Sequence, residues 1–347
     1  MRAVQYRAFG GPIELADRDE PIPDPDGVVI HVESTGLCRS DWHGWQGHDP
    51  DIRQLPHVPG HELAGQVVAI GSSVREFAVG DRVTVPFVCG CGSCRHCLAG
   101  DAQVCPQQWQ PGFSGPGSFA EFVAIPRADA NLVALPDTVS LDAAASLGCR
   151  FATAYRAVTR IGQVQAGDRI LVLGCGGVGL SILMIALARG AQAIAVDVSP
   201  AALELAESLG AQSIHTDGDV AEAVRERTGG GVDVSFDALG SIDTCRAGVN
   251  ALRPRGRHIQ VGLLPAAEVG DRATVPMHRV IGLELAILGS HGMASRDYPE
   301  LIDLVAGGAL DPMRLVTRIL PLDQAPSALA EMSGRGHPGI TLIHPFA

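Results

Sequence analysis

A glycine-rich segment at residues 174–179, Gly-Cys-Gly-Gly-Val-Gly, restricts the possible folds of this chain more than any other feature. It follows an apolar run of strand length at 170–173 and precedes an apolar stretch of helical length at 180–189. Glycines in such a turn let the backbone approach a pyrophosphate, and the helix N-terminus offers free N–H groups to the phosphates. The pattern G-x-G-x-x-G alone is a weak signal. Between a strand and a helix, however, it favours a dinucleotide-binding turn over a glycine-rich turn without nucleotide.

The region around this turn alternates between strand-like and helix-like segments. We expect strands at 169–173, 193–197, 213–215, 232–238 and 258–261, and helices at 180–189, 200–209, 220–228 and 241–252. This alternation predicts right-handed βαβ crossovers and a parallel sheet. The residues that we expect to contact the cofactor here are Gly174, Gly176, Gly177, Val178, Gly179, Asp197 and Val261.

Asp197 ends the second of these strands and indicates which nucleotide binds. A carboxylate at this position accepts a hydrogen bond from the ribose 2′-OH of NAD, and its charge repels the 2′-phosphate of NADP. No arginine lies between Asp197 and Arg225 to compensate for that charge. The sequence therefore predicts NAD as the cofactor.

The residues on either side of this region are richer in short β-like segments. β-Branched runs bounded by Gly, Pro or Asp occur at 27–33, 64–70 and 81–85, and no helical pattern of useful length precedes Leu141. An alanine-rich helical pattern follows at 143–159, and β-like residues return at 339–345. A chain of 347 residues is long enough for two domains. We predict an α/β protein with a β-rich domain at 1–150 and 291–347 and a nucleotide-binding domain at 151–290.

The composition excludes several classes of function. A net charge of −12 does not suit binding to nucleic acid or to an anionic membrane. All 26 basic residues are arginine, so there is no lysine for a Schiff base, for pyridoxal phosphate or for a phosphate loop. The longest apolar stretch, at 170–188, is interrupted by glycines, and the N-terminal residues lack the apolar core of a signal peptide. We therefore expect a cytoplasmic enzyme with a small-molecule substrate and neither a nucleic-acid nor a membrane partner.

Four cysteines lie in one short segment with the spacing C-x2-C-x2-C-x7-C: Cys91, Cys94, Cys97 and Cys105. Four thiolates from one loop complete a tetrahedral shell around zinc, the usual composition of a structural site. A ferredoxin-type iron–sulfur cluster is disfavoured, because its motif places three residues, not seven, before the last cysteine. Disulfides are disfavoured because the chain has no secretion signal. The spacing therefore predicts a structural zinc site.

Three further residues, Cys38, His61 and Cys149, are far apart in the sequence. We expect Gly148 and Cys149 to start the helix that leads into the second domain. Two cysteines and one histidine leave a fourth coordination position open, which is the arrangement of a catalytic zinc site. Each residue taken alone favours ordinary packing, since a lone cysteine is commonly a small buried hydrophobe, so the interpretation depends on the three together.

Five segments carry a resemblance to a known family: GLCRSDWH, PGHELAG, the four-cysteine loop, SLGCRFATAYRA and the GCGGVG turn. Over nearly its whole length the chain resembles the zinc-dependent medium-chain alcohol dehydrogenases. The resemblance implies a GroES-like catalytic domain, a Rossmann domain, two zinc ions per chain and NAD as the hydride acceptor. It also implies a homo-oligomer, either a dimer or a tetramer. By this resemblance Cys38, His61 and Cys149 are the ligands of the catalytic zinc.

The same resemblance assigns roles to the residues around that metal. Ser40 matches the hydroxyl that bonds the substrate oxygen, and His43 matches the base that ends a proton relay through the nicotinamide ribose. Asp41 matches the carboxylate that orients the zinc-bound histidine. Glu62 matches a carboxylate that can approach the metal during ligand exchange, and Arg39 lies where some members hold the pyrophosphate.

The substrate is less well defined. Four aromatic residues flank the zinc-site segments: Trp42, Trp45, Phe87 and Trp109. They are either ordinary core residues or pocket residues that would favour an apolar or aromatic primary alcohol. Cys149 favours the same substrates, since polyol-oxidising relatives tend to replace that thiol. The tail at 336–340 lacks a basic residue that some relatives place near the pyrophosphate, and Arg335 is the candidate substitute.

Two rival functions are disfavoured by residues that the chain contains. A zinc-free quinone or enoyl reductase of the same superfamily would lack Cys38, His61 and the four-cysteine loop. A non-catalytic protein that binds zinc and nucleotide would lack Ser40 or His43.

Overall fold

The computed structural model of the chain describes residues 1–215, 218–264, 270, 275–334 and 337–347. The chain divides into two compact units, unit 1 (Met1–Ala152 and Gly292–Ala347) and unit 2 (Thr153–His291). The domain boundaries that we expected, at 150 and 291, lie next to these divisions. Among the described residues, no helix is both long enough and apolar enough to cross a bilayer.

Unit 1 contains a mixed sheet in the order β14-β15-β3-β4-β5-β7, with β6 paired to β3, and a separate pair of β1 and β2. The strands are β1 (Arg2–Tyr6), β2 (Ile13–Asp17), β3 (Val28–Leu37), β4 (Glu62–Ile70), β5 (Arg82–Thr84), β6 (Phe122–Ile125), β7 (Val133–Ala134), β14 (Val316–Pro321) and β15 (Ile340–His344). The β-like runs of the sequence correspond to β3, β4, β5 and β15. Strands β1 and β2 were not predicted, because charged and small residues interrupt their apolar pattern.

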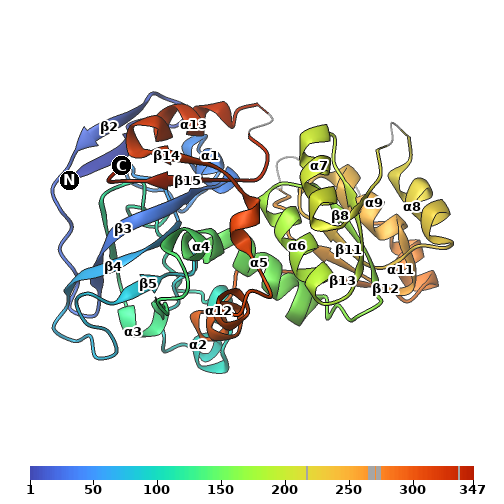
Figure 1. The fold of residues 1–347 in the computed structure, drawn as a ribbon, viewed down its shortest axis with the longest axis horizontal. Helices are drawn as coiled ribbons and strands as arrows, with labels where there is room; N and C mark the ends of the chain where they lie inside the picture. The colour runs from blue at the N-terminus through green and yellow to red at the C-terminus, as the bar shows by residue number, and fades with distance from the viewer. Residues whose placement is uncertain (216–217, 265–269, 271–274, 335–336) are drawn as a thin grey trace. The chain divides into compact units, whose positions relative to one another are not determined.

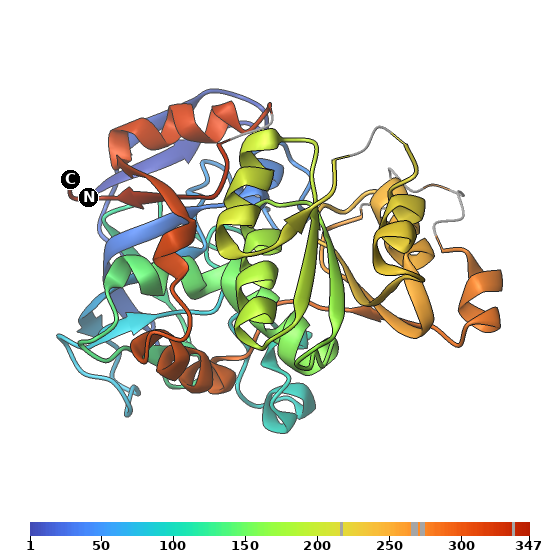
Figure 2. The ribbon, with the colours of Figure 1, turned by 45° about the vertical axis from the view of Figure 1, so that its right-hand side comes forward.

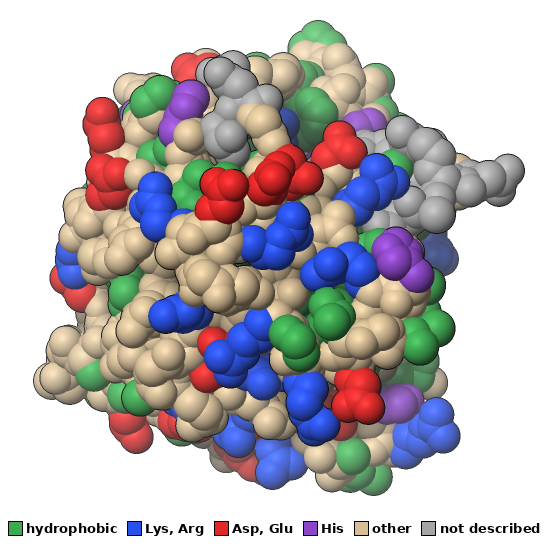
Figure 3. Space-filling model, turned by 90° about the vertical axis from the view of Figure 1, so that its right-hand side faces the viewer, with side chains coloured by type: hydrophobic (Ala, Val, Ile, Leu, Met, Phe, Trp, Pro, Cys, Tyr) green, Lys and Arg blue, Asp and Glu red, His purple; other side chains and the backbone are tan. Residues whose placement is uncertain are grey.

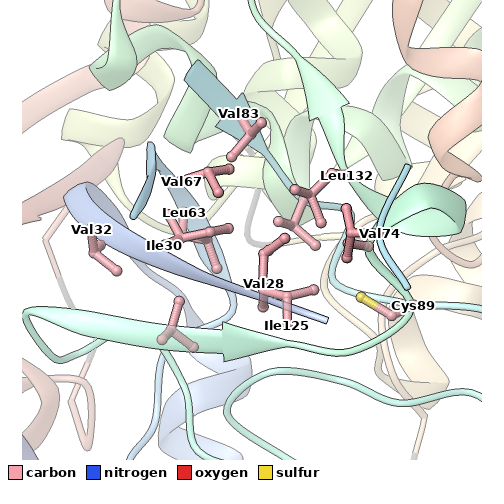
Figure 4. Close-up of a cluster of buried hydrophobic side chains, with 13 residues drawn as sticks. Val28, Ile30, Val32, Leu63, Val67, Val74, Val83, Cys89, Ile125 and Leu132 are labelled. Atoms are coloured by element: carbon pink, nitrogen blue, oxygen red, sulfur yellow. The ribbon is translucent and has the colours of Figure 1, made fainter. Parts of the chain in front are cut away.

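The pairing of β3 with β4 positions the candidate site. The two strands run antiparallel, from Val28 opposite Ile70 to Gly36 opposite Glu62. Their apolar side chains fill the core drawn in Figure 4, in which Ile30 is completely buried. Because the pairing ends at Gly36 and Glu62, the residues that follow β3 and those that precede β4 lie at the same end of the sheet.

The helices of unit 1 are short. They are α1 (Arg39–Trp45), α2 (Arg95–Ala99), α3 (Ala128–Asn131), α4 (Leu141–Ser146), α12 (Tyr298–Ala306) and α13 (Ala325–Glu331). The first three precede Leu141, where the sequence shows no helical pattern of useful length, since none of them is long enough to show a helical repeat. Helix α1 begins instead at a local capping box formed by Cys38 and Asp41.

The helical region predicted at 143–159 is less regular than expected. It consists of α4, a π-helical turn (Leu147–Phe151), α5 (Ala152–Arg156) and a second π-helical turn (Ala157–Ile161). The prediction that Cys149 starts a helix was wrong, because this residue lies inside the first π-helical turn. Gly148 marks a close approach rather than a helix start: a Cβ there would lie 2.9 Å from the Cα of Glu62 in β4.

Unit 2 contains a parallel sheet in the order β10-β9-β8-β11-β12-β13. The strands are β8 (Arg169–Leu173), β9 (Gln192–Val196), β10 (Gln212–Ser213), β11 (Val232–Asp237), β12 (Leu252–Gln260) and β13 (Ala286–Gly289). The helices are α6 (Gly177–Ala188), α7 (Pro200–Leu209), α8 (Val220–Thr228), α9 (Ile242–Asn250) and α11 (Met277–Gly282). Helices α6 and α7 cover one face of the sheet, and α8 and α9 cover the other (Figures 1 and 2). The predicted α/β fold with a Rossmann sheet is confirmed.

Some boundaries in unit 2 differ from the predictions. Helix α6 begins at Gly177 rather than at residue 180, because the last residues of the glycine-rich turn form the first turn of the helix. Strand β12 begins at Leu252, where we expected a helix to end, since α9 already stops at Asn250. Strand β13 was not predicted.

Charged side chains of both signs share the face of the molecule drawn in Figure 3. Arginine side chains spread across the middle and lower part of this face, and acidic side chains lie mainly toward its top, with a few among the arginines.

Candidate active site

Cys38, His61 and Cys149 come together in unit 1 although they are distant in the sequence. Their ligand atoms all lie within 4.8 Å of one another. Cys38 follows β3, His61 directly precedes β4, and Cys149 approaches from the π-helical turn. The antiparallel pairing of β3 and β4 therefore brings Cys38 and His61 together. The close packing of Gly148 against β4 places Cys149 next to them.

Asp41 orients this group through three hydrogen bonds. One carboxylate oxygen accepts from the His61 Nδ1–H at 2.9 Å and from the Gly60 N–H at 3.0 Å, and the other accepts from the Cys38 N–H at 2.9 Å. The Nε2 atom of His61 is then left buried, with no hydrogen-bond partner among the described residues. A carboxylate that holds one nitrogen of a histidine while the other faces two thiols is the arrangement found around zinc.

The charges in this cluster favour a divalent cation. The hydrogen bond from Cys149 lowers the pKa of Cys38 well below its ordinary value, and the same contact raises the pKa of Cys149. Burial opposes protonation of His61, but Asp41 and Cys38 outweigh it and raise the pKa of the ring well above its ordinary value. Metal binding replaces protons on such ligands, so the donor set and its charge fit Zn²⁺.

Helix α1 carries the polar residues next to the three ligands. The Ser40 hydroxyl oxygen lies 3.8 Å from the Cys38 sulfur. His43 lies about one helical turn from Ser40, so the two side chains are on neighbouring positions of the helix surface. The Nδ1 atom of His43 lies 3.0 Å from the Nδ1 atom of His48, a residue that the sequence analysis did not single out.

Glu62 is completely buried and is held by Arg150. The backbone N–H of Arg150 and its Nε–H donate to one carboxylate oxygen at 2.9 and 3.0 Å, and its Nη2 contacts the other. Burial alone would lower the pKa of Arg150, but the charges of Glu62 and Cys38 raise it above its ordinary value. The sequence analysis missed this arginine, although it directly follows Cys149 in SLGCRFATAYRA.

The four cysteines at 91–105 form a second cluster in unit 1, with ligand atoms also within 4.8 Å of one another. The sulfur of Cys94 lies 3.6 Å from that of Cys97 and 3.7 Å from that of Cys105. Hydrogen bonds from the N–H groups of Ser93 and Cys94 lower the pKa of Cys91 to about 6. All four thiols are free, and the cluster is compatible with a structural zinc.

The residues predicted to contact the nucleotide lie at the carboxyl ends of strands in unit 2, where such sheets bind ligands. Gly174 follows β8 with φ of +91°, and a Cβ on Gly179 would collide with its carbonyl oxygen. A Cβ on Gly176 would meet nothing within 4 Å, so the backbone is open to a ligand there. Val178 and Gly177 form the first turn of α6, for which no side chain provides an N-cap hydrogen bond.

Asp197 directly follows β9 and braces the glycine-rich turn. Its carboxylate accepts from the N–H of Cys175 at 2.6 Å and from the N–H of Ser199 at 2.8 Å. Val261 directly follows β12 and donates its N–H to the Asp237 carbonyl at 3.0 Å. Both residues lie at the same edge of the sheet as the glycine-rich turn.

The aromatic residues divide between core and site. Trp45 is buried in one apolar cluster, on which Trp42 also packs, and Trp109 packs on the cluster of Figure 4. The three tryptophans therefore pack against the apolar cores. The rings nearest to that of His61 are Phe113, at 5.1 Å between centroids, and Phe87, at 6.1 Å. Phe113 was not predicted.

Arg39 contacts residues of unit 1. Its guanidinium lies 4.5 Å from the centroid of the Trp42 ring and donates to the carbonyl oxygens of Met332 and Gly334. Arg335, the candidate substitute for a basic contact with the pyrophosphate, lies outside the described residues, as does Gly336 of the tail that follows it.

Comparison with known proteins identifies similar chains over the whole length. The family model described as alcohol dehydrogenase GroES-like domain matches residues 24–137, and the model described as zinc-binding dehydrogenase matches residues 177–307. A protein named probable zinc-binding alcohol dehydrogenase from Mycobacterium tuberculosis is 34% identical, covering 96% of this chain and 86% of that protein. The D-arabitol-phosphate dehydrogenase of Enterococcus avium is also 34% identical, covering 93% and 92%. A solved structure of an NAD-dependent alcohol dehydrogenase is 33% identical, with a TM-score of 0.88 over 99% of both chains.

Proposed function

Because the chain belongs to the family of zinc-dependent medium-chain alcohol dehydrogenases, we propose that it transfers hydride reversibly between an alcohol and NAD. The observation that carries this proposal is the group of Cys38, His61 and Cys149, with its unpartnered buried nitrogen and the Ser40 hydroxyl beside it. Three protein ligands leave one coordination position for a substrate oxygen. The four-cysteine loop would hold a second zinc with no open position.

Our proposed mechanism divides the reaction among residues of unit 1. Zinc held by the three ligands supplies a Lewis acid that lowers the pKa of an alcohol hydroxyl. Ser40 positions that hydroxyl and accepts its proton as it gives up its own proton toward His43, which carries it toward solvent. Asp41 keeps the Nε2 atom of His61 directed at the cysteines. Glu62 stays away from the metal while Arg150 holds both of its oxygens.

Unit 2 binds the nucleotide in this proposal. The open backbone around Gly176 and the first turn of α6 accept the pyrophosphate, and Asp197 accepts from the ribose hydroxyls. Arg39 remains our candidate for a further contact with the pyrophosphate. NAD supplies the hydride acceptor. The carboxylate of Asp197 supports NAD over NADP, since a phosphate beside it would meet like charge.

We propose an apolar or aromatic primary alcohol as the substrate. The rings of Phe87 and Phe113 support this choice, because they place apolar surface next to the ring of His61, one of the proposed zinc ligands. A polyol is the second candidate, supported by the likeness to D-arabitol-phosphate dehydrogenase. We further propose a cytoplasmic homo-oligomer, either a dimer or a tetramer.

Metal analysis combined with a substrate panel tests the proposal. The purified chain, loaded with zinc, should reduce NAD with benzyl alcohol or a primary aliphatic alcohol faster than with sorbitol or arabitol. It should contain two zinc ions per chain. Preferential oxidation of the polyols would make a polyol, rather than an apolar primary alcohol, the proposed substrate. No reduction of NAD with any alcohol would overturn the proposed function.

A further inference from the structure

His48 forms a fixed pair with His43. Their Nδ1 atoms lie 3.0 Å apart, and the backbone N–H of His48 donates to the carbonyl oxygen of His43 at 3.0 Å. Gly47 makes the pairing possible, since its φ of +78° reverses the chain after α1 and brings His48 back over the helix end. The contact therefore depends on two hydrogen bonds and a turn, rather than on the chance position of a surface side chain.

The two rings differ in their access to water. His43 is half-buried and His48 is exposed. The indole of Trp42 meets both rings edge-on, at 5.0 Å from His43 and 5.7 Å from His48. Together, the pair spans from helix α1, which carries Ser40, to the solvent.

From this geometry we propose that His48 is the outer member of the proton relay: it takes the substrate proton from His43 and releases it to solvent. The inference rests on the proposed function, because it requires that His43 receives a proton during alcohol oxidation. Imidazole suits this step, since it binds a proton at one ring nitrogen and gives up another from the second.

The protons balance along this path. His43 begins neutral with its Nδ1–H donating to the Nδ1 atom of His48. It accepts the substrate proton at Nε2 and transfers the Nδ1 proton to His48, which then loses one proton to water or buffer. One proton enters and one leaves, and exchange with water restores the starting tautomers.

Charged groups near the pair influence its proton affinity. Those on α1, on the loop that follows it and on the neighbouring helix α13 are Arg39, Asp41, Asp49, Asp51, Arg53 and Glu331. In general, a nearby carboxylate favours the charged form of an imidazole and a nearby arginine opposes it. Replacement of His48 should therefore change the pH dependence of proton release without touching the metal ligands.

The experiment compares His48→Gln with His43→Gln and with the control His278→Gln, which removes an exposed histidine on α11 of unit 2. In stopped-flow oxidation of benzyl alcohol by the zinc-loaded enzyme in weak buffer, absorbance reports NADH and a pH indicator reports the proton. For His48→Gln we expect proton release to slow by about 3–10-fold, less than the usual range for general-base catalysis because water partly replaces the ring. Added imidazole buffer, or a higher pH, should restore the rate. Zinc content and the KM for NAD should not change.

The possible outcomes separate the relay from the function on which it rests. Proton release by His48→Gln that matches the wild type and His278→Gln, while His43→Gln is slowed, would end the relay at His43 and overturn the inference. A slowed rate that imidazole does not restore would assign His48 a purely structural role and also overturn it. A zinc-loaded wild type that reduces no NAD with any alcohol would overturn the proposed function, and the relay with it.

Discussion

Substitution of Arg150 by methionine should strongly destabilise unit 1, because Arg150 is the counter-charge of a completely buried carboxylate. Glu62 is 0% exposed and Arg150 only 5%. The methionine would keep much of the apolar volume and the backbone N–H bond, but would remove both guanidinium contacts to Glu62. Loss of one partner from a buried ion pair typically costs about 3–5 kcal/mol of unfolding free energy.

The expected change is large enough to measure by calorimetry. For a unit of roughly 150–250 residues, each kcal/mol shifts the Tm by about 2–4 °C, so the Arg150→Met protein should melt about 10 °C lower. The double variant Glu62→Gln with Arg150→Met removes the stranded charge and should recover most of that loss. Arg7→Met is the matched control, because it breaks an exposed ion pair with Glu14 in the same unit and should change the Tm little.

Protein and zinc concentrations must be equal in all four samples, since bound metal raises the apparent stability. A Tm of Arg150→Met equal to that of the wild type would refute the reasoning, as would a double variant less stable than Arg150→Met. Either result would mean that Glu62 does not depend on Arg150 for its charge balance.

Three further predictions follow from the two metal clusters, the nucleotide turn and a buried histidine. Cys38→Ser should abolish alcohol oxidation in a folded chain that still binds NAD, whereas Cys94→Ser should mainly lower the Tm. Elemental analysis of the wild type checks the number of zinc ions. Fewer than about two zinc equivalents in the fully active wild type would contradict both expectations. The wild type should prefer NAD over NADP by on the order of a hundredfold in kcat/KM, and Asp197→Ser should relax this preference; equal efficiency with both cofactors would contradict the role of Asp197. Burial lowers the pKa of His258, so its contribution to the free energy of unfolding should be complete above about pH 6.5 and decline as the pH falls. Urea titrations at pH 7 and pH 5 should therefore show that the free energy of unfolding falls less on acidification for His258→Asn than for the wild type. An equal fall in both proteins would exclude His258 as a source of this pH dependence.

The sequence predicted those parts of the molecule that local patterns specify. The glycine-rich turn and the strands and helices around it are short-range features, so strands β8 to β12 of the parallel sheet in unit 2 follow from residues 168–261. Cys91, Cys94, Cys97 and Cys105 are likewise close in the sequence, and their spacing alone predicts a cluster. The grouping of Cys38, His61 and Cys149 required the family resemblance, since no local pattern connects them.

The remaining features depend on contacts between distant segments. Nothing in the sequence around Glu62 indicates that Arg150 is its partner, because their pairing follows from the close packing of the π-helical turn on β4. Phe113 reaches His61 through a loop whose path no motif predicts. The pairing of His43 with His48 was missed for a different reason: the two are five positions apart, which is not a contact spacing within a helix, and it takes the left-handed turn at Gly47 to bring them together.

The two cysteine-containing clusters also differ in when they can form. The four cysteines at 91–105 lie within one loop, so little chain must be ordered before their sulfurs can surround an ion. Cys38, His61 and Cys149 meet only after β3 has paired with β4 and the π-helical turn has docked on them. Contacts between distant segments form slowly, because each one closes a long loop. During synthesis, we therefore expect the four-cysteine cluster to be able to bind zinc before Cys38, His61 and Cys149 have come together.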